Sequence, residues 1–128
     1  MSKPKVFISH SEADRDWARA FAQSLQAQGV RVWLDDMEIQ LGQPVEKELE
    51  RGLRGSDIIA FVLTSENLRS PNMLFELGAA LGMRKPAVAI VPNDLEASQL
   101  PYPLRVRRFL RRQSPEETAK TFLAETAA

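Results

Sequence analysis

The stretch DIIAFVLTSENLRSPNMLFELGAALGMRKPAVAIVP, residues 57–92, contains the pattern that decides the fold. Its first part, 57–64, is almost wholly apolar, as in a strand that is buried on both faces of a parallel sheet. The Ser-Pro pair at 70–71 suits the start of a helix, and Gly82 suits its end. A second apolar run follows at 87–92. The stretch therefore predicts two strands joined by a helix, the repeating unit of α/β proteins.

The same alternation continues on both sides of this stretch. Further strands are predicted at 5–9, 30–35 and 106–110, further helices at 11–28, 44–54 and 114–125, and an irregular loop at 93–103. In the first helix, Trp17, Phe21 and Leu25 recur at every fourth position and form one apolar face. Ser11 is predicted to cap that helix, with Asp14 in the capping-box position. Five strands alternating with helices predict a flavodoxin-like doubly wound parallel sheet, in the order 2-1-3-4-5, with helices on both faces.

The composition narrows the class of protein. The chain has 128 residues, a formal net charge of zero, no cysteine and a single histidine, His10. The length fits one domain, so we expect residues 1–128 to form a single unit, of the kind that also occurs inside longer proteins. Without cysteine, disulfides, thiolate nucleophiles and cysteine-based zinc sites are excluded, and one histidine excludes a multi-histidine metal site.

Targeting signals are not evident in the sequence. The apolar run within residues 1–10 is too short for a signal peptide, and no segment approaches the length of a membrane span. We therefore expect a cytoplasmic location and no membrane partner. Zero net charge also gives no general attraction to nucleic acid.

A single acid, Glu76, interrupts the apolar helix predicted at 71–82. Ligands of open α/β sheets bind beyond the carboxyl ends of the strands, where the strand order reverses, which here lies between the first and third strands. The first strand ends at residues 9–11, and the helix with Glu76 leaves the end of the third. Asp35 and Asp36 end the second strand and approach the same crevice.

Helix geometry places Glu76 on a different side of the helix from the nearby leucines. At about 100° per residue, Leu74, Leu77 and Gly78 share one side of the helix, and Glu76 lies nearly opposite, below Asn72. Because its other neighbours are small or apolar, this acid is expected to be partly desolvated. The residues alone leave a plain surface glutamate open as the alternative.

Three segments, taken in order, resemble the TIR (Toll/interleukin-1 receptor) domain family. KVFISHSEADRDWARAFAQSLQAQGVRVWLDD (5–36) resembles the family's opening, and IQLGQPV (39–45) resembles its BB loop. SDIIAFVLTSENLRSPNMLFELGAALGMRKPAVAIV (56–91) resembles the segment with two serines and a Glu-Leu pair. The resemblance extends over about residues 5–125, and the Glu-Leu-Gly-Ala-Ala variant looks prokaryotic.

This resemblance implies an activity. Many TIR domains hydrolyse NAD+ at the nicotinamide–ribose bond or cyclise the product, and the family's catalytic glutamate falls on Glu76. Nicotinamide leaves a pyridinium as a neutral base, so it needs no general acid. One carboxylate can then suffice to stabilise an oxocarbenium-like transition state. NAD+ is the expected substrate, and we expect no cofactor and no metal.

The resemblance also implies a nucleotide crevice. Its residues would be Phe7, Ser9, His10, Ser11, Trp33, Asp35, Ser65, Ser70 and Asn72. Structural roles stay open for several of them: strand core for Phe7 and Trp33, helix caps for Ser11 and Ser70. Asn72 departs from the family, which often has an aromatic residue four positions before the glutamate.

Assembly is a further implication of the resemblance. The BB loop, here Ile39, Leu41, Gly42 and Pro44, mediates stacking of TIR domains in the family, and sites are often completed between neighbouring subunits. We therefore expect other TIR domains as partners, as a homo-oligomer or filament, together with a fused or associated sensor domain. The resemblance to prokaryotic members implies an effector in antiviral defence and low activity of the isolated monomer.

Other readings of the sequence remain. A non-catalytic TIR adaptor is favoured by Asn72, and a nucleoside 2-deoxyribosyltransferase-like enzyme also uses a glutamate near a similar stretch. A phospho-acceptor receiver domain shares the strand order, but no acidic pair follows the first strand. Five arginines between 105 and 112 are interpreted as protection of an edge strand rather than a nucleic-acid surface.

Overall fold

The computed structural model describes residues 4–36 and 45–126, with the side chains of 35, 36 and 45–48 not included. The BB-loop residues named above, Ile39, Leu41, Gly42 and Pro44, lie outside the described residues. The strands are β1 (Lys5–His10), β2 (Arg31–Asp36), β3 (Ile58–Val62), β4 (Ala87–Val91) and β5 (Leu110–Arg111). The α-helices are α1 (Arg15–Ala27), α2 (Val45–Arg54), α3 (Pro71–Gly82), α4 (Tyr102–Arg105) and α5 (Pro115–Thr126), with short 3-10 turns η1 (Glu12–Asp14) and η2 (Ala97–Gln99).

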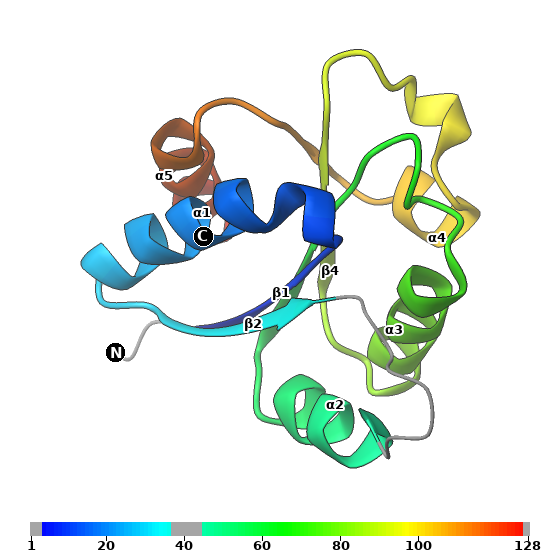
Figure 1. Ribbon diagram of the computed structural model, residues 1–128, viewed down its shortest axis with the longest axis horizontal. Helices are drawn as coiled ribbons and strands as arrows, with labels where there is room; N and C mark the ends of the chain where they lie inside the picture. Colours follow the sequence, from blue (N-terminus) through cyan, green and yellow to red (C-terminus); the bar gives the residue numbers. More distant parts are fainter. Residues whose placement is uncertain (1–3, 37–44, 127–128) are drawn as a thin grey trace.

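All strand pairs are parallel, and the order in the sheet is β2-β1-β3-β4-β5. This confirms the predicted flavodoxin-like topology. Helices α1 and α5 cover one face of the sheet, and α2, α3 and α4 cover the other (Figure 1). In the described part of the chain, no helix has both the length and the apolar character needed to cross a membrane.

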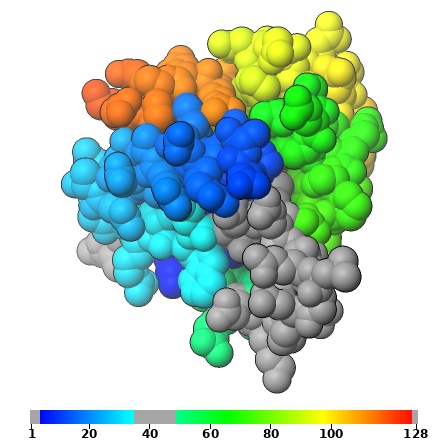
Figure 2. Space-filling model, viewed as in Figure 1, coloured from blue at the N-terminus to red at the C-terminus, as the bar shows by residue number. Residues whose placement is uncertain are grey.

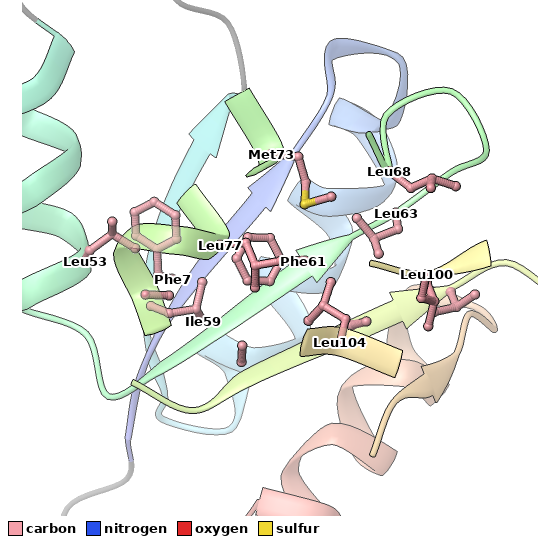
Figure 3. Close-up of a cluster of buried hydrophobic side chains, with 14 of the residues drawn as sticks. Phe7, Leu53, Ile59, Phe61, Leu63, Leu68, Met73, Leu77, Leu100 and Leu104 are labelled. Atoms are coloured by element: carbon pink, nitrogen blue, oxygen red, sulfur yellow. The ribbon is translucent and has the colours of Figure 1, made fainter. Parts of the chain in front are cut away.

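Alternating strand residues divide the core in two. Phe7, Ile59 and Phe61 point to the face of α2 and α3, and meet Met73 and Leu77 of α3 (Figure 3). Their neighbours in the strands point the other way, toward α1 and α5. Because successive side chains of a strand alternate between faces, each strand contributes to both cores and reads as one continuous apolar run.

The predicted start of the first helix is only partly correct. Ser11 precedes η1, and its hydroxyl donates to Asp14 Oδ2 at 3.2 Å instead of accepting from a helix N–H, so there is no capping box. Helix α1 begins later, at Arg15. Asp14 accepts from Arg112 Nη1 at 2.8 Å, and this guanidinium lies 4.5 Å from the centre of the Trp17 ring. The pair ties the start of α1 to the end of β5.

The fifth strand was predicted four residues too early, at 106–110. Residues 106–109 form a turn and an irregular segment after the short helix α4 (Tyr102–Arg105), which Pro101 and Pro103 open, and β5 is confined to Leu110–Arg111. The arginines of this region all donate to acceptors in the chain: Ser98, Pro103, Pro92 and Leu95 carbonyls, and the carboxylates of Asp14 and Glu125. Through these hydrogen bonds the arginines stabilise the edge of the sheet by linking it to other parts of the same chain.

Two helices end in the same way with different residues. After α1, Gly29 has φ 84°, with hydrogen bonds from Gly29 N to Gln26 O and from Val30 N to Leu25 O. After α3, Arg84 has φ 59°, with the equivalent bonds from Arg84 N to Leu81 O and from Lys85 N to Ala80 O. Both are Schellman motifs. Gly82, the predicted stop, is the last helical residue, and Arg84 occupies the left-handed position.

This difference predicts a stabilising substitution. A side chain in the left-handed conformation costs about 1–2 kcal/mol, and glycine avoids that cost while losing more backbone entropy on folding. Arg84→Gly should therefore raise the free energy of unfolding by about 0.5–1 kcal/mol in urea denaturation. The matched variant Gly29→Ala should lower it by about 1 kcal/mol. An unchanged or lower stability of Arg84→Gly would show that the Arg84 side chain stabilises the fold by other contacts.

Candidate functional site

Glu76 lies on the buried face of α3. That face consists of Met73, Glu76, Leu77 and Ala80, and Glu76 is only 2% exposed. The prediction that the acid faces a desolvated environment is confirmed, and the surface-glutamate reading is wrong. Leu74, which was predicted to lie on the side of the helix opposite Glu76, is 45% exposed.

The Glu76 carboxylate accepts a hydrogen bond from strand β1. Ser9 Oγ donates to Glu76 Oε1 at 2.8 Å, and Ser9 is fully buried. Ser9 points to this side because it is two residues after Phe7, whose ring packs against α2 and α3. A buried carboxylate is costly unless it is hydrogen-bonded, so this contact favours burial of the acid.

His10, the next residue, points to the opposite face. Alternation along β1 places its side chain with Val6 and Ile8, which pack in the core beneath α1. The ring is 1% exposed, and its Nδ1 lies 2.9 Å from the carbonyl oxygen of Ser11. Because a carbonyl oxygen only accepts, Nδ1 carries the proton in this bond. The histidine and the glutamate thus lie on different sides of the sheet.

A pocket of about 320 Å³ lies beyond the carboxyl ends of β1 and β3, as predicted for the reversal of strand order. It is lined by Ser11, Glu12, Ala13, Glu66, Asn67, Ser70 and Asn72. In Figure 2 the blue surface after β1 meets the green surface that leads into α3. Asn72 and Glu76 are four residues apart and therefore share one side of the helix. The buried acid thus lies one turn below a residue that lines the pocket.

The charge of the pocket is negative. Glu12 and Glu66 belong to its lining, and both side chains are exposed. Among the described residues that line it there is no lysine or arginine. A pocket with this lining favours a cationic group over a phosphate. In the described ranges 4–36 and 45–126 no cluster of three or more metal-ligating side chains was found.

Asn67 shapes the pocket wall. Its Oδ1 accepts from Thr64 N at 2.8 Å, and its Nδ2 donates to Val62 O at 3.1 Å, so the side chain fixes the turn after β3. It is 5% exposed. Sequence reasoning did not assign it a role, nor did it assign one to Glu12, Ala13 or Glu66. An Asn three residues after Thr at a strand end is a typical turn-forming pattern and could have identified Asn67.

Phe7 and Trp33 lie in or against the core. A Cβ added at Gly52 would lie 2.7 Å from Trp33 Cε2 and 2.9 Å from Phe7 Cε2, so the absence of a side chain at Gly52 lets α2 approach both rings. Lys5 Nζ lies 5.7 Å from the centre of the Trp33 ring. Contact of either ring with a nucleotide stays a prediction.

Of the remaining predicted residues whose side chains the structure describes, only Ser70 is among those that line the pocket. Ser70 caps α3, with its hydroxyl accepting from Met73 N at 3.1 Å, so the cap reading applies to this residue. Ser65 is exposed in the turn after β3. Asp35 and Asp36 pair in register with Ser9 and His10, and their side chains lie outside the description.

Comparison with known proteins gives a family match over most of the chain. A family model described as TIR domain matches residues 6–123. The 2' cyclic ADP-D-ribose synthase AbTIR of Acinetobacter baumannii is 33% identical over 73 residues, which are 56% of this chain and 27% of the relative. The NAD(+) hydrolase PdTIR of Paracoccus denitrificans is 34% identical over 61 residues, 47% of this chain and 20% of the relative. The matched regions thus span only 27% and 20% of these relatives.

Solved structures support the fold. The metazoan TIR-STING receptor from C. gigas, solved in complex with 2',3'-cGAMP, superimposes with a TM-score of 0.76 at 19% sequence identity. The match covers 96% of this chain and 39% of that one. At this identity the likeness concerns the fold alone.

The contacts of Asn67 predict its contribution to stability. Asn67→Ala removes the partners of a backbone N–H and a backbone carbonyl in a part-buried turn, which should cost about 1–3 kcal/mol of unfolding free energy. The matched variant Asn93→Ala, in an exposed loop, should stay within about 0.5 kcal/mol of wild type. Urea denaturation followed by circular dichroism measures both. Equal stability of the two variants would contradict the structural role of Asn67.

Proposed function

The chain belongs to the TIR domain family, and from this membership we propose that it cleaves NAD+ at the nicotinamide–ribose bond, with Glu76 as the catalytic carboxylate. One observation carries the proposal. A single acid is buried on α3, bonded to Ser9, one helical turn below the pocket at the reversal of strand order. Relatives named as an NAD(+) hydrolase and a 2' cyclic ADP-D-ribose synthase support it.

The proposed chemistry needs one carboxylate. As the C1′–N bond breaks, its electron pair goes to the pyridinium nitrogen, and nicotinamide leaves uncharged without a proton. The ribose gains positive charge, which the anionic Glu76 stabilises most strongly in a site shielded from water. Water then adds to C1′ and loses a proton, which gives ADP-ribose. If a hydroxyl of the same ADP-ribosyl cation adds to C1′ instead and loses its proton, the product is cyclic.

The pocket supports one orientation of the substrate. Its volume, about 320 Å³, is at the low end for sites that enclose a ligand, so it suits one end of a dinucleotide. The carboxylates of Glu12 and Glu66 favour the cationic nicotinamide and disfavour the diphosphate. We therefore place nicotinamide and its ribose toward Glu76, and the rest of NAD+ outside the pocket.

The part of NAD+ that lies outside the pocket needs further contacts with protein. We propose that a second copy of the domain supplies them, so that assembly activates the enzyme. A filament, a sensor domain that triggers assembly and a role in antiviral defence belong to the same proposal. They rest on the family resemblance.

A non-catalytic adaptor is the second candidate. Asn72 favours it, because this residue lines the pocket where many TIR enzymes have an aromatic side chain to stack on a base. Asn72→Trp separates the two readings. In an enzyme with a weak base contact, this variant should lower the KM for NAD+, whereas an adaptor should release no nicotinamide with either residue.

Glu76→Gln should abolish most NAD+ cleavage. The amide keeps the size of the side chain and removes its charge, so nicotinamide release should fall by about 10²–10³-fold, as for loss of one group that stabilises a charged transition state. Chromatography of the products from NAD+ measures the rate and separates linear from cyclic ADP-ribose. Glu116→Gln, at an exposed position of α5, is the matched control and should behave as wild type. Cleavage that persists in Glu76→Gln would refute the assignment, and base exchange on deoxynucleosides without NAD+ cleavage would favour the transferase reading.

Activation by assembly predicts a dependence on protein concentration. Specific activity should rise several-fold over a dilution series from nanomolar to tens of micromolar, and again on addition of a crowding agent, because each shared site needs two chains. Light scattering under the same conditions reports the assembly state. Specific activity that stays constant while the assembly state changes would contradict this part of the proposal.

A further inference from the structure

We propose that Ser9 is a positioning residue that holds the Glu76 carboxylate in its working orientation and ionised state. The inference rests on the proposed function and reassigns Ser9, which the family resemblance places among substrate-binding residues. Its basis is the bond from Ser9 Oγ to Glu76 Oε1, at 2.8 Å between two side chains that are 0% and 2% exposed. This is an ordinary length for an O–H···O hydrogen bond.

The surroundings of Ser9 make this role specific. It is a polar side chain in a strand that is buried at every position after Lys5, and a buried hydroxyl is costly unless it is hydrogen-bonded. Its acceptor lies 67 residues away on α3, so the bond fixes the helix acid to the sheet. Met73, Leu77 and Ala80, the other residues on the buried face of α3, are apolar and offer Glu76 no hydrogen bond from their side chains.

Ser56 provides the comparison within the same chain. It is also 0% exposed, but its hydroxyl donates at 2.6 Å to the carbonyl of Gly52, four residues earlier, which satisfies a local backbone group at the end of α2. The two serines are equally buried and equally bonded. They differ in the acceptor, which is a backbone carbonyl for Ser56 and the candidate catalytic carboxylate for Ser9.

The Ser9 hydroxyl acts on the carboxylate in two ways. It fixes the position of one oxygen, and small displacements of a catalytic group lower the rate strongly. It also donates to the charged form, which favours ionisation of an acid in an apolar setting. Of the other ionisable groups nearby, Glu12 and Glu66 line the pocket and favour protonation of Glu76, while His10 lies on the opposite face of the sheet. Ser9 therefore opposes both the apolar burial and the acidic lining.

The test compares Ser9→Ala with Ser56→Ala under assembling conditions. Both should lower the melting temperature to a similar extent, because each removes one buried hydrogen bond. Only Ser9→Ala should lower kcat, by about 10–100-fold with KM within about two-fold of wild type. The acid limb of its kcat–pH profile should move to higher pH, since loss of the donor makes Glu76 easier to protonate. Ser9→Cys keeps the volume with a weak donor and should show the same changes if Ser9→Ala does not fold.

The outcomes are distinguishable. Wild-type kcat and acid limb in both Ser9 variants would overturn the positioning role, and a raised KM with unchanged kcat would return Ser9 to the substrate-binding residues. Loss of kcat in Ser56→Ala equal to that in Ser9→Ala would show a general effect of stability, which also overturns the proposal. If the folded wild-type assembly releases no nicotinamide from NAD+, the proposed function itself fails. If wild-type activity disappears in Glu76→Gln while Ser9→Ala keeps a normal kcat, the role of Ser9 is refuted and the proposed function is not.

Discussion

Strand β1 lies between β2 and β3, and this one constraint of topology generates the site. From the end of β1 the chain continues to α1 on one face of the sheet, while the segment after β3 continues to α3 on the other face. No helix can then cover the carboxyl ends of both strands. The gap is lined by the two departing segments, and the buried pair of Ser9 in β1 and Glu76 in α3 belongs to the elements that adjoin them.

The same site shows a conflict between stability and function. An apolar residue at position 76 would pack with Met73, Leu77 and Ala80 without desolvating a charge. The chain instead has a carboxylate there and a serine opposite it, in a strand whose other buried residues before His10 are apolar. Buried polar pairs of this kind cluster at functional sites, and the two carboxylates that line the pocket, Glu12 and Glu66, raise the cost of a third negative charge below them. The combination is expected of a site that stabilises a cation.

The sequence predicted the strand order and the presence of helices on both faces, because parallel strands buried on both sides read as apolar runs and turns are marked by Gly and Pro. It placed Glu76 at the reversal of strand order for the same reason. Which side of α3 faces the core was not predictable, since a helix that is apolar nearly all round has no preferred buried side. In the structure, packing against the sheet buries Met73 and leaves Leu74 exposed. The end of α3 at Gly82 was predicted, but the residue in the left-handed position after it was not, because Arg84 adopts a conformation that usually signals Gly. The pocket acids were missed because Glu12 and Glu66 belong to turns, where periodicity gives no information.

The most direct test of the role of Glu76 is a crystal structure of the assembled protein with a non-hydrolysable analogue of NAD+. We predict that nicotinamide lies in the pocket between Ser11 and Asn72, with C1′ of its ribose in contact with the Glu76 carboxylate and Ser9 still bonded to Oε1. An analogue bound with its diphosphate in the pocket, or with the ribose remote from a Glu76 that stays covered, would contradict a catalytic role for this acid.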